Sequence, residues 1–167
     1  EIAAGELYNS AAAVSAEGVL QVYRKTHLFA DEQDLFLPGN SGFGVFEHGG
    51  ARIGMMICFD WVFPESARSL ALLGAQIIAH PSNLVLQHCQ QSMLTRSLEN
   101  GVFSITCNRF GEETLGEKTL RFTGSSQIVG NRGARLAQSP PEGEDVELVS
   151  FDPQLADNKF FTARNHL

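Results

Sequence analysis

A cysteine stands where an apolar run ends and a helix-like segment begins, in "GMMICFDWVFPE" (residues 54–65). Ligands of α/β sheets bind at the carboxyl ends of strands, and a sharp strand-to-helix turn exposes the residue at its tip. The N–H groups that open a helix would lower the pKa of a thiol placed there and stabilise an oxyanion. Cys58 is therefore a candidate nucleophile, and a small core side chain is the equally supported alternative.

A lysine and a glutamate elsewhere in the sequence could complete such a site. Lys25, in "YRKTHLF", interrupts a strand that otherwise alternates, and a buried lysine is costly unless it is paired. Glu32 follows in the loop "DEQDLFLPG" and could hold Lys25. The alternatives are an exposed lysine that packs its aliphatic chain along the surface and a solvated loop carboxylate.

Three further residues carry weaker signals for a binding site. Asp60 and Trp61 follow the cysteine and could line a pocket. Trp61 is more simply explained as a packing residue, because tryptophan buries a large area. Asn83 ends the strand-like "IIAHPSN" and could either face a substrate or form a turn.

The remaining cysteines and nearby histidines do not indicate a second site. Cys107 lies in the middle of the strand-like "VFSITCNR", which predicts a buried filler. His80, His88 and Cys89 could be drawn as a metal-binding set, but their spacing fits no standard zinc pattern. We therefore predict no metal site.

The elements that would position these residues alternate between strands and helices. Between residues 52 and 109 the order is strand, helix, strand, helix, strand. The first helix is predicted to begin at Pro64 and stop at Gly74, and the second is closed by Gly101. This alternation is typical of an α/β domain.

Hairpins flank this alternating unit on both sides. Their turns are predicted at residues 16–18, 48–50 and 131–133, where glycine and polar residues gather. A further strand is predicted over 145–153, and residues 29–44 hold too many turn formers for a regular element.

Composition bounds the domain and its partners. A chain of 167 residues that is 43% hydrophobic can bury one globular core. Its net charge of -7, without a Lys/Arg cluster, argues against nucleic acid and anionic membranes. Three widely spaced cysteines do not suggest a disulfide framework, so a cytoplasmic location is expected. Because both ends look like cuts through a larger unit, residues 1–167 are expected to form one domain, incomplete at both ends.

Taken together, these segments resemble the nitrilase superfamily of carbon–nitrogen hydrolases over essentially the whole chain. The matching landmarks, in order, are "LYNSAAAVSAEGVLQVYRKTHLF", "EQDLFLPGN", "GMMICFDWVFPESARSLALLGAQIIAHPSN", "RSLENGVFSITCNRFGEE" and "FTGSSQIVGNRGARLA". The resemblance implies an αββα sandwich with a Glu–Lys–Cys triad. Cys58 matches the nucleophile, Lys25 the triad lysine, and Glu32 the additional active-site glutamate. The first glutamate of the family, the general base, would lie upstream of these residues and has no counterpart here.

The resemblance also implies a reaction. A thioester forms on Cys58 during hydrolysis of an amide or N-carbamoyl bond, and Lys25 and the backbone N–H of Phe59 stabilise the oxyanion. Neither a cofactor nor a metal is required. "ICFD" resembles the amidase and carbamoylase-like branches, whereas the longer segment around it also resembles small archaeal-type nitrilases, so a small nitrile is the alternative substrate. A non-catalytic, nitrilase-like binding domain is the alternative of another class, and a homodimer or larger homo-oligomer is expected.

Overall fold

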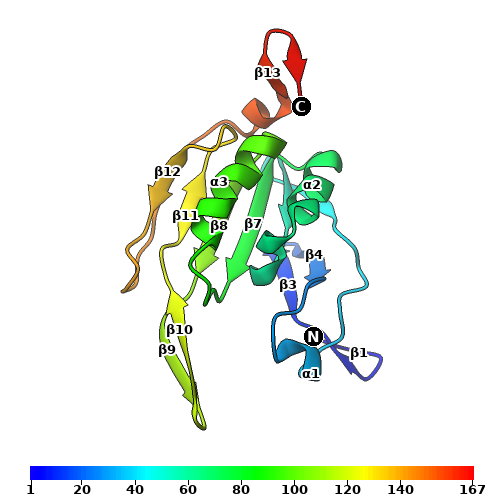
Figure 1. The fold of residues 1–167 in the computed structure, drawn as a ribbon. Coiled ribbons are helices and arrows are strands. Elements are labelled where there is room, and N and C mark those ends of the chain that lie inside the picture. Colours follow the sequence, from blue (N-terminus) through cyan, green and yellow to red (C-terminus); the bar gives the residue numbers. More distant parts are fainter.

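A mixed sheet of six strands forms the middle of the structure, a computed structural model that describes residues 1–167 apart from the side chain of Leu115 (Figure 1). The three central strands run parallel, and the outer pairs are antiparallel. Across the sheet the strands are β12 (Arg135–Gln138), β11 (Gln127–Val129), β8 (Phe103–Asn108), β7 (Ile77–Ser82), β6 (Ala51–Met55) and β5 (Val45–His48). The parallel centre requires crossover helices, which the sequence supplies between these strands.

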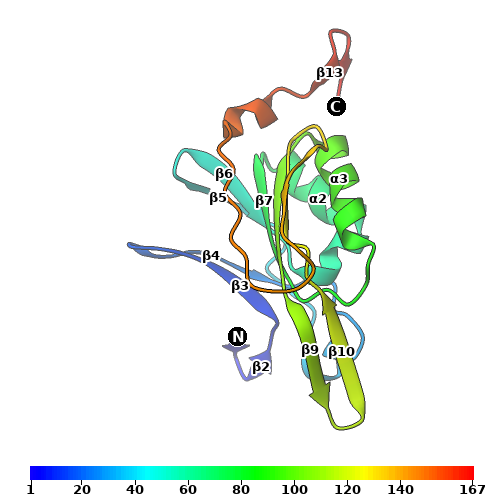
Figure 2. The same ribbon diagram turned by 90° about the vertical axis from the view of Figure 1, so that its left-hand side faces the viewer.

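Two helices, α2 (Pro64–Leu72) and α3 (Cys89–Asn100), supply these crossovers and cover one face of the sheet (Figure 2). Pro64 occupies the first helical position of α2, where the missing N–H is not needed. Gly101 ends α3 in the left-handed conformation, with φ of 61°. No helix in the described part of the chain combines the length and apolar character needed to cross a bilayer.

The core between helices and sheet is well filled. Met56, Leu70, Ile78, Met93 and Val102 are fully buried within it. Gly54 of β6 permits the close approach of α2, because a Cβ there would lie 2.7 Å from Cδ2 of the α2 residue Leu70. This packing fixes the carboxyl ends of β6 and β7, where the candidate site begins.

A hairpin of β3 (Ser10–Ser15) and β4 (Gly18–Arg24) lies against the other face of the sheet (Figure 2). Tyr23 of β4 packs with Met55 and Ile57 in a second buried cluster. The structure therefore has three layers: helices, the six-stranded sheet, and a hairpin from a second β layer.

Shorter elements surround these layers. Two 3₁₀ helices cover Cys58–Val62 and Pro153–Asp157. The others are β1 (Ile2–Ala3), β2 (Glu6–Leu7), α1 (Glu32–Leu35), β9 (Phe110–Leu115), β10 (Lys118–Thr123), β13 (Phe160–Thr162) and β14 (Asn165–His166). The hairpin of β9 and β10 projects from the sheet (Figures 1 and 2), and its strands were not among the predicted elements.

The structure confirms the three predicted turns and both predicted helices, but the strand predicted over 145–153 is wrong. A strand needs a neighbour for its backbone hydrogen bonds, and none pairs with this segment in the described structure. Two of its apolar side chains project into solvent, with Val146 83% and Leu148 90% exposed, while the Phe151 ring stacks on Phe103. The loop predicted over 29–44 contains the single helical turn α1.

Candidate active site

The structure places Cys58 in a strained turn three residues after the end of β6. Its φ is 43°, in the left-handed region that non-glycine residues rarely adopt. Such a conformation persists when its surroundings hold it, and it is common at active sites. Here the carbonyl oxygen of Cys58 lies 2.9 Å from Nε2 of the buried residue His80, which fixes the turn from the β7 side.

Burial dominates the electrostatics of the Cys58 thiol. It raises the pKa above the ordinary thiol value, while the positive charge of Lys25 and the backbone N–H groups of Asn83 and Phe59 lower the pKa by less. The expectation of a lowered pKa is therefore wrong. One reason is that Cys58 opens only a short 3₁₀ helix, Cys58–Val62, and α2 begins later, at Pro64. The thiol needs a base before it can act as a nucleophile.

The structure brings Lys25 and Glu32 together. The Lys25 side chain is completely buried, and its Nζ lies 2.5 Å from Glu32 Oε2. The same oxygen accepts the backbone N–H of Phe29 at 2.7 Å, and Oε1 accepts Asn9 Nδ2 at 2.8 Å. Three donors therefore hold the Glu32 carboxylate, and the carboxylate compensates the buried ammonium.

The backbone of Lys25 is held on both sides. Its N–H donates to the carbonyl of Asn9 at 2.8 Å, and its own carbonyl accepts the N–H of Gly39 at 2.8 Å. A side chain at Gly39 has no room, because a Cβ there would lie 2.0 Å from the carbonyl oxygen of Arg24. The "LPG" stretch is thus pressed against the segment that carries the lysine.

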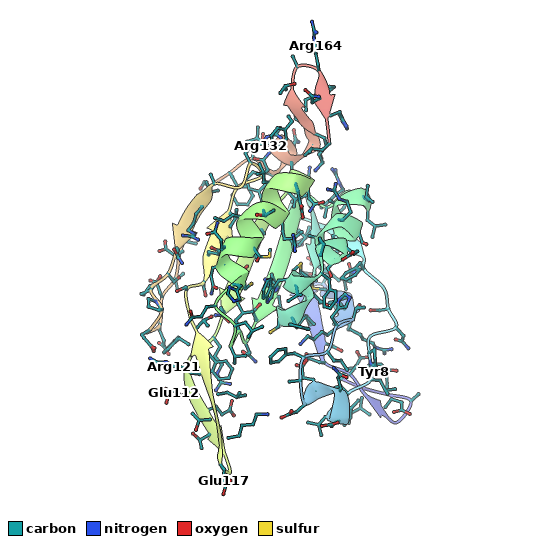
Figure 3. The ribbon with its side chains drawn as sticks, viewed as in Figure 1. Tyr8, Glu112, Glu117, Arg121, Arg132 and Arg164 are labelled. Atoms are coloured by element: carbon teal, nitrogen blue, oxygen red, sulfur yellow. The ribbon has the colours of Figure 1, made fainter. Side chains whose placement is uncertain are left out.

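A cavity of about 1070 Å³ opens beside these groups. Cys58, Glu32 and Asn83 line it, together with residues of the β9–β10 hairpin that include Glu113 and Lys118. Figure 3 shows that hairpin, marked by Glu112, Arg121 and Glu117, standing across from the α1 and Tyr8 region. Lys25 is fully buried next to this cavity, and its charge acts on the Cys58 thiol.

Asp60 and Trp61 do not line this cavity. Asp60 is fully buried and turns toward Tyr23 and His27, to which it is hydrogen-bonded. Trp61 packs in the helix-side core and borders only a space of about 10 Å³ next to Cys58, room for about one water molecule. The structure therefore gives both residues a place behind the nucleophile, in contrast to the pocket-lining positions considered from the sequence.

His80 supports the nucleophile turn. Burial lowers the pKa of its imidazole to about 4, so the ring is neutral near pH 7. A neutral ring that donates from Nε2 to the carbonyl of Cys58 can accept the hydroxyl of Thr106 at Nδ1, 3.1 Å away. Within the described side chains, no group of three or more His, Cys, Asp or Glu is placed to hold a metal ion.

Cys107 corrects a second expectation. It is exposed and lines the same cavity as Cys58, so the prediction of a buried filler is wrong. In β8 the side chains of Ser104 and Thr106 are buried, whereas Ile105 and Cys107 point to the opposite, less covered face. Alternation along the strand explains the exposure. By contrast, Cys89 is buried in the core.

The comparisons with known proteins agree with this geometry. The family model for carbon–nitrogen hydrolases matches residues 1–158. The chain belongs to the carbon–nitrogen hydrolase family. A curated relative, described as a nitrilase of Pyrococcus abyssi, is 46% identical over 153 residues, which are 92% of this chain and 57% of the relative. The chain thus spans little more than half the length of the curated relatives that it matches.

Solved structures of carbon–nitrogen hydrolases share the fold. The crystal structure of one from Helicobacter pylori G27 aligns with a TM-score of 0.80 at 30% identity, over 86% of this chain and 57% of that one. An amidase variant from Nesterenkonia sp. AN1, which carries acrylamide added to its active-site cysteine, aligns with a TM-score of 0.68 at 32% identity, over 75% and 49%. The predicted nitrilase-like α/β fold is therefore confirmed.

Several residues that shape the site were not found from the sequence. Tyr23 and His27 lie two positions on either side of Lys25, a spacing that could have suggested a shared face. His80 was noticed only as a metal ligand, although a histidine in a buried strand also calls for hydrogen-bond partners. Asn9, a single polar residue beside a strand, carried no signal of its contact with Glu32.

Proposed function

We propose that the complete protein hydrolyses the carbon–nitrogen bond of a small amide or N-carbamoyl compound through a thioester on Cys58. The observation that carries the proposal is the strained turn at Cys58, which places the thiol in the lining of the large cavity. The buried Lys25–Glu32 pair beside it supports the same reading. The role of an active-site cysteine in the Nesterenkonia amidase adds independent support.

The first step is attack by the thiolate. Because burial raises the pKa of the Cys58 thiol, a base must take the proton, and the family pattern assigns this to a glutamate upstream of residue 1. The sulfur then bonds to the carbonyl carbon, and the carbonyl π electrons move to oxygen. The Lys25 ammonium and the Phe59 N–H stabilise that oxyanion. The Lys25 ammonium has three N–H groups, and one of them donates a hydrogen bond to Glu32. This bond orients the ammonium.

The second step releases nitrogen and then the acid. The carbon–nitrogen bond breaks, the nitrogen leaves with the proton held by the base, and a thioester remains on Cys58. Water loses a proton to the same base and attacks the thioester. The carbon–sulfur bond then breaks, the thiol regains its proton, and a carboxylic acid is released, or a carbamic acid from an N-carbamoyl substrate.

Ammonia release by the complete protein tests this reaction. Simple amides, an N-carbamoyl amine and small nitriles would be supplied in parallel, with intact-mass detection of the acyl adduct. Cys58→Ala should abolish both turnover and adduct. Cys107→Ala is the matched control, since it removes a thiol from the same cavity. Turnover that survives Cys58→Ala would refute the proposal.

A nitrile is the alternative substrate, favoured by the 46% identity to a relative described as a nitrilase. Attack of Cys58 on a nitrile carbon gives a thioimidate, which takes up water, loses ammonia and becomes the same thioester. Faster ammonia release from nitriles than from the matching amides would select this alternative.

A binding domain without catalysis is the alternative of another class, in which the cavity beside Cys58 would hold an amide without cleaving it. Amide binding by the complete protein without any ammonia release would support it. A glutamate found at the family position upstream, together with turnover, would exclude it.

Self-association is also proposed on the resemblance. The resemblance implies an interface formed by the helices that follow the nucleophile, α2 and α3. Sedimentation velocity of the complete protein should show a homodimer or a larger species, and a monomer at micromolar concentration would contradict it. A cytoplasmic location stays a prediction.

A further inference from the structure

The buried carboxylate of Asp60 is surrounded by four hydrogen-bond donors. The residue is fully buried. Its Oδ2 accepts the backbone N–H of Ile57 at 2.8 Å and the hydroxyl of Tyr23 at 2.9 Å. Its Oδ1 accepts the backbone N–H of His27 at 3.2 Å and Nδ1–H of the same residue at 2.8 Å. Four donors meet two oxygens, which accounts for the buried charge without any substrate.

These donors come from the two segments that carry the reactive groups. Tyr23 and His27 lie two residues on either side of Lys25, and Ile57 directly precedes Cys58. The carboxylate therefore joins the lysine segment to the nucleophile turn, which are more than 30 residues apart in the sequence. A displacement of one segment relative to the other would lengthen these hydrogen bonds.

The surroundings keep this junction rigid. Burial, and next the charge of Asp60, raise the pKa of the Tyr23 hydroxyl, so it stays a protonated donor at neutral pH. The same hydroxyl accepts the backbone N–H of Thr26 at 3.1 Å. The His27 ring stacks on Phe63 with 3.8 Å between centroids, which extends the contact to the residue before α2.

We propose that Asp60 is a positioning residue for the hydrolysis and sets the place of the Lys25 ammonium relative to the Cys58 sulfur. This inference rests on the function proposed above. Asp60 acts through Tyr23, His27 and Ile57 and does not touch the substrate. A misplacement of catalytic groups by about 1 Å costs about 100-fold in rate, so the junction has a large effect on turnover from behind the cavity wall.

Asp60→Asn in the complete protein is the primary test. An amide NH₂ in place of one carboxylate oxygen faces two donors and cannot accept from them. We expect kcat to fall about 100-fold with KM changed less than about threefold, because the side chain lies outside the cavity. Asp157→Asn is the matched control: it makes the same substitution at a carboxylate bonded to Arg52 and Gln76, outside the site, and should leave kcat unchanged.

Two further measurements separate positioning from folding. Tyr23→Phe retains the carboxylate and removes one donor, so kcat should fall about threefold to tenfold. In a Lys25→Ala background, Asp60→Asn should lower kcat by much less than in wild type, because part of its effect passes through the lysine. Full additivity in this cycle would overturn the proposal. If circular dichroism shows that Asp60→Asn is unfolded, the same double-mutant cycle is measured with Tyr23→Phe and Lys25→Ala, and full additivity there would overturn the proposal.

The outcomes distinguish the two proposals. Turnover that survives Cys58→Ala refutes the function itself. An inactive Cys58→Ala together with wild-type kcat in folded Asp60→Asn refutes only the positioning role. A raised KM with unchanged kcat in Asp60→Asn would indicate direct substrate contact and would also overturn the positioning role.

Discussion

The Cys58 turn and the β9–β10 hairpin line the same cavity, but different interactions hold them. Around the turn, fully buried Asp60 and His80 make hydrogen bonds of 2.8–3.2 Å. On the hairpin, Lys118 pairs with Asp31, and Arg109 pairs with Glu113 at 2.7 Å, with all four side chains largely exposed. Hydrogen bonds to a charged group such as the Asp60 carboxylate contribute about 1.5–3 kcal/mol, and bonds between neutral groups, as at His80, about 0.5–1.5 kcal/mol. Exposed ion pairs contribute about 0–1 kcal/mol.

This contrast suggests a division of roles between the two ends of the cavity. The buried end, formed by the Cys58 turn and its supports Asp60 and His80, fixes the geometry of bond breaking. The exposed end, formed by the β9–β10 hairpin, can change with little loss of stability. The Glu112–Arg121 pair, 3.7 Å apart and visible on the hairpin in Figure 3, belongs to the same exposed class. Substitutions at the buried end should therefore alter kcat, and substitutions at the exposed end should alter substrate preference and salt dependence.

Among the substitutions that compare the two regions, Lys25→Ala should lower turnover the most. Removing one oxyanion donor typically lowers activity about 100- to 1,000-fold, and Lys25 also carries the charge that moderates the pKa of Cys58. Steady-state kinetics of the complete protein measure the change. The matched control is Lys118→Ala, which removes a lysine from the hairpin. Equal losses of activity in the two variants would contradict the proposed difference between the buried and the exposed end of the cavity.

Gly39→Ala should come next. Its Cβ would collide with the backbone of Arg24, and backbone cannot yield as a flexible side chain does. We expect a loss of about 1–3 kcal/mol in stability and about 100-fold in kcat, through displacement of Lys25. Gly130→Ala is the control, because its Cβ would meet only ordinary contacts. Thermal unfolding and kinetics together test this, and an unaffected Gly39→Ala would show that the lysine segment tolerates movement.

Thiol labelling should sharpen the comparison within one cavity. In residues 1–167, iodoacetamide near pH 7 should modify exposed Cys107 first, then Cys58, and buried Cys89 last. Burial raises the pKa of the Cys58 thiol, so its thiolate fraction is small at pH 7 and grows as the pH rises. Each unit by which the pKa exceeds the pH lowers that fraction roughly tenfold. Peptide mapping by mass spectrometry gives the order, and Cys58 reacting first would contradict the pKa direction.

Loss of the Lys118–Asp31 pair should have the smallest effect. An exposed pair contributes about 0–1 kcal/mol, so Asp31→Asn should change KM less than about fivefold. That change should fade at high salt, because a Debye length shrinks to about 3 Å at 1 M. A large fall in kcat that persists at high salt would place the hairpin among the parts that control the chemistry.

The sequence was most informative where local pattern and chemistry coincide. Cys58 could be placed at the end of a strand because the apolar run and the following Pro64 mark both sides of the turn. Its strained φ and the buried support from Asp60 and His80 could not be predicted, because they depend on contacts between distant segments. Cys107 was misjudged because a position in the middle of a strand does not reveal which face of that strand is covered. The strand over 145–153 shows the reverse case: alternation is present, but no partner strand pairs with it.

The left-handed backbone at Cys58 means that the residue needed for activity lowers the stability of the fold. A side chain costs roughly 1–2 kcal/mol in this conformation, and only glycine avoids the cost. Cys58→Gly should therefore be about 1 kcal/mol more stable than Cys58→Ala, although both lack the thiol. Thermal unfolding of this pair would measure the conformational energy held at one residue. Natural or laboratory selection for stability alone should then remove the nucleophile, so persistence of cysteine at this position would mark selection for activity.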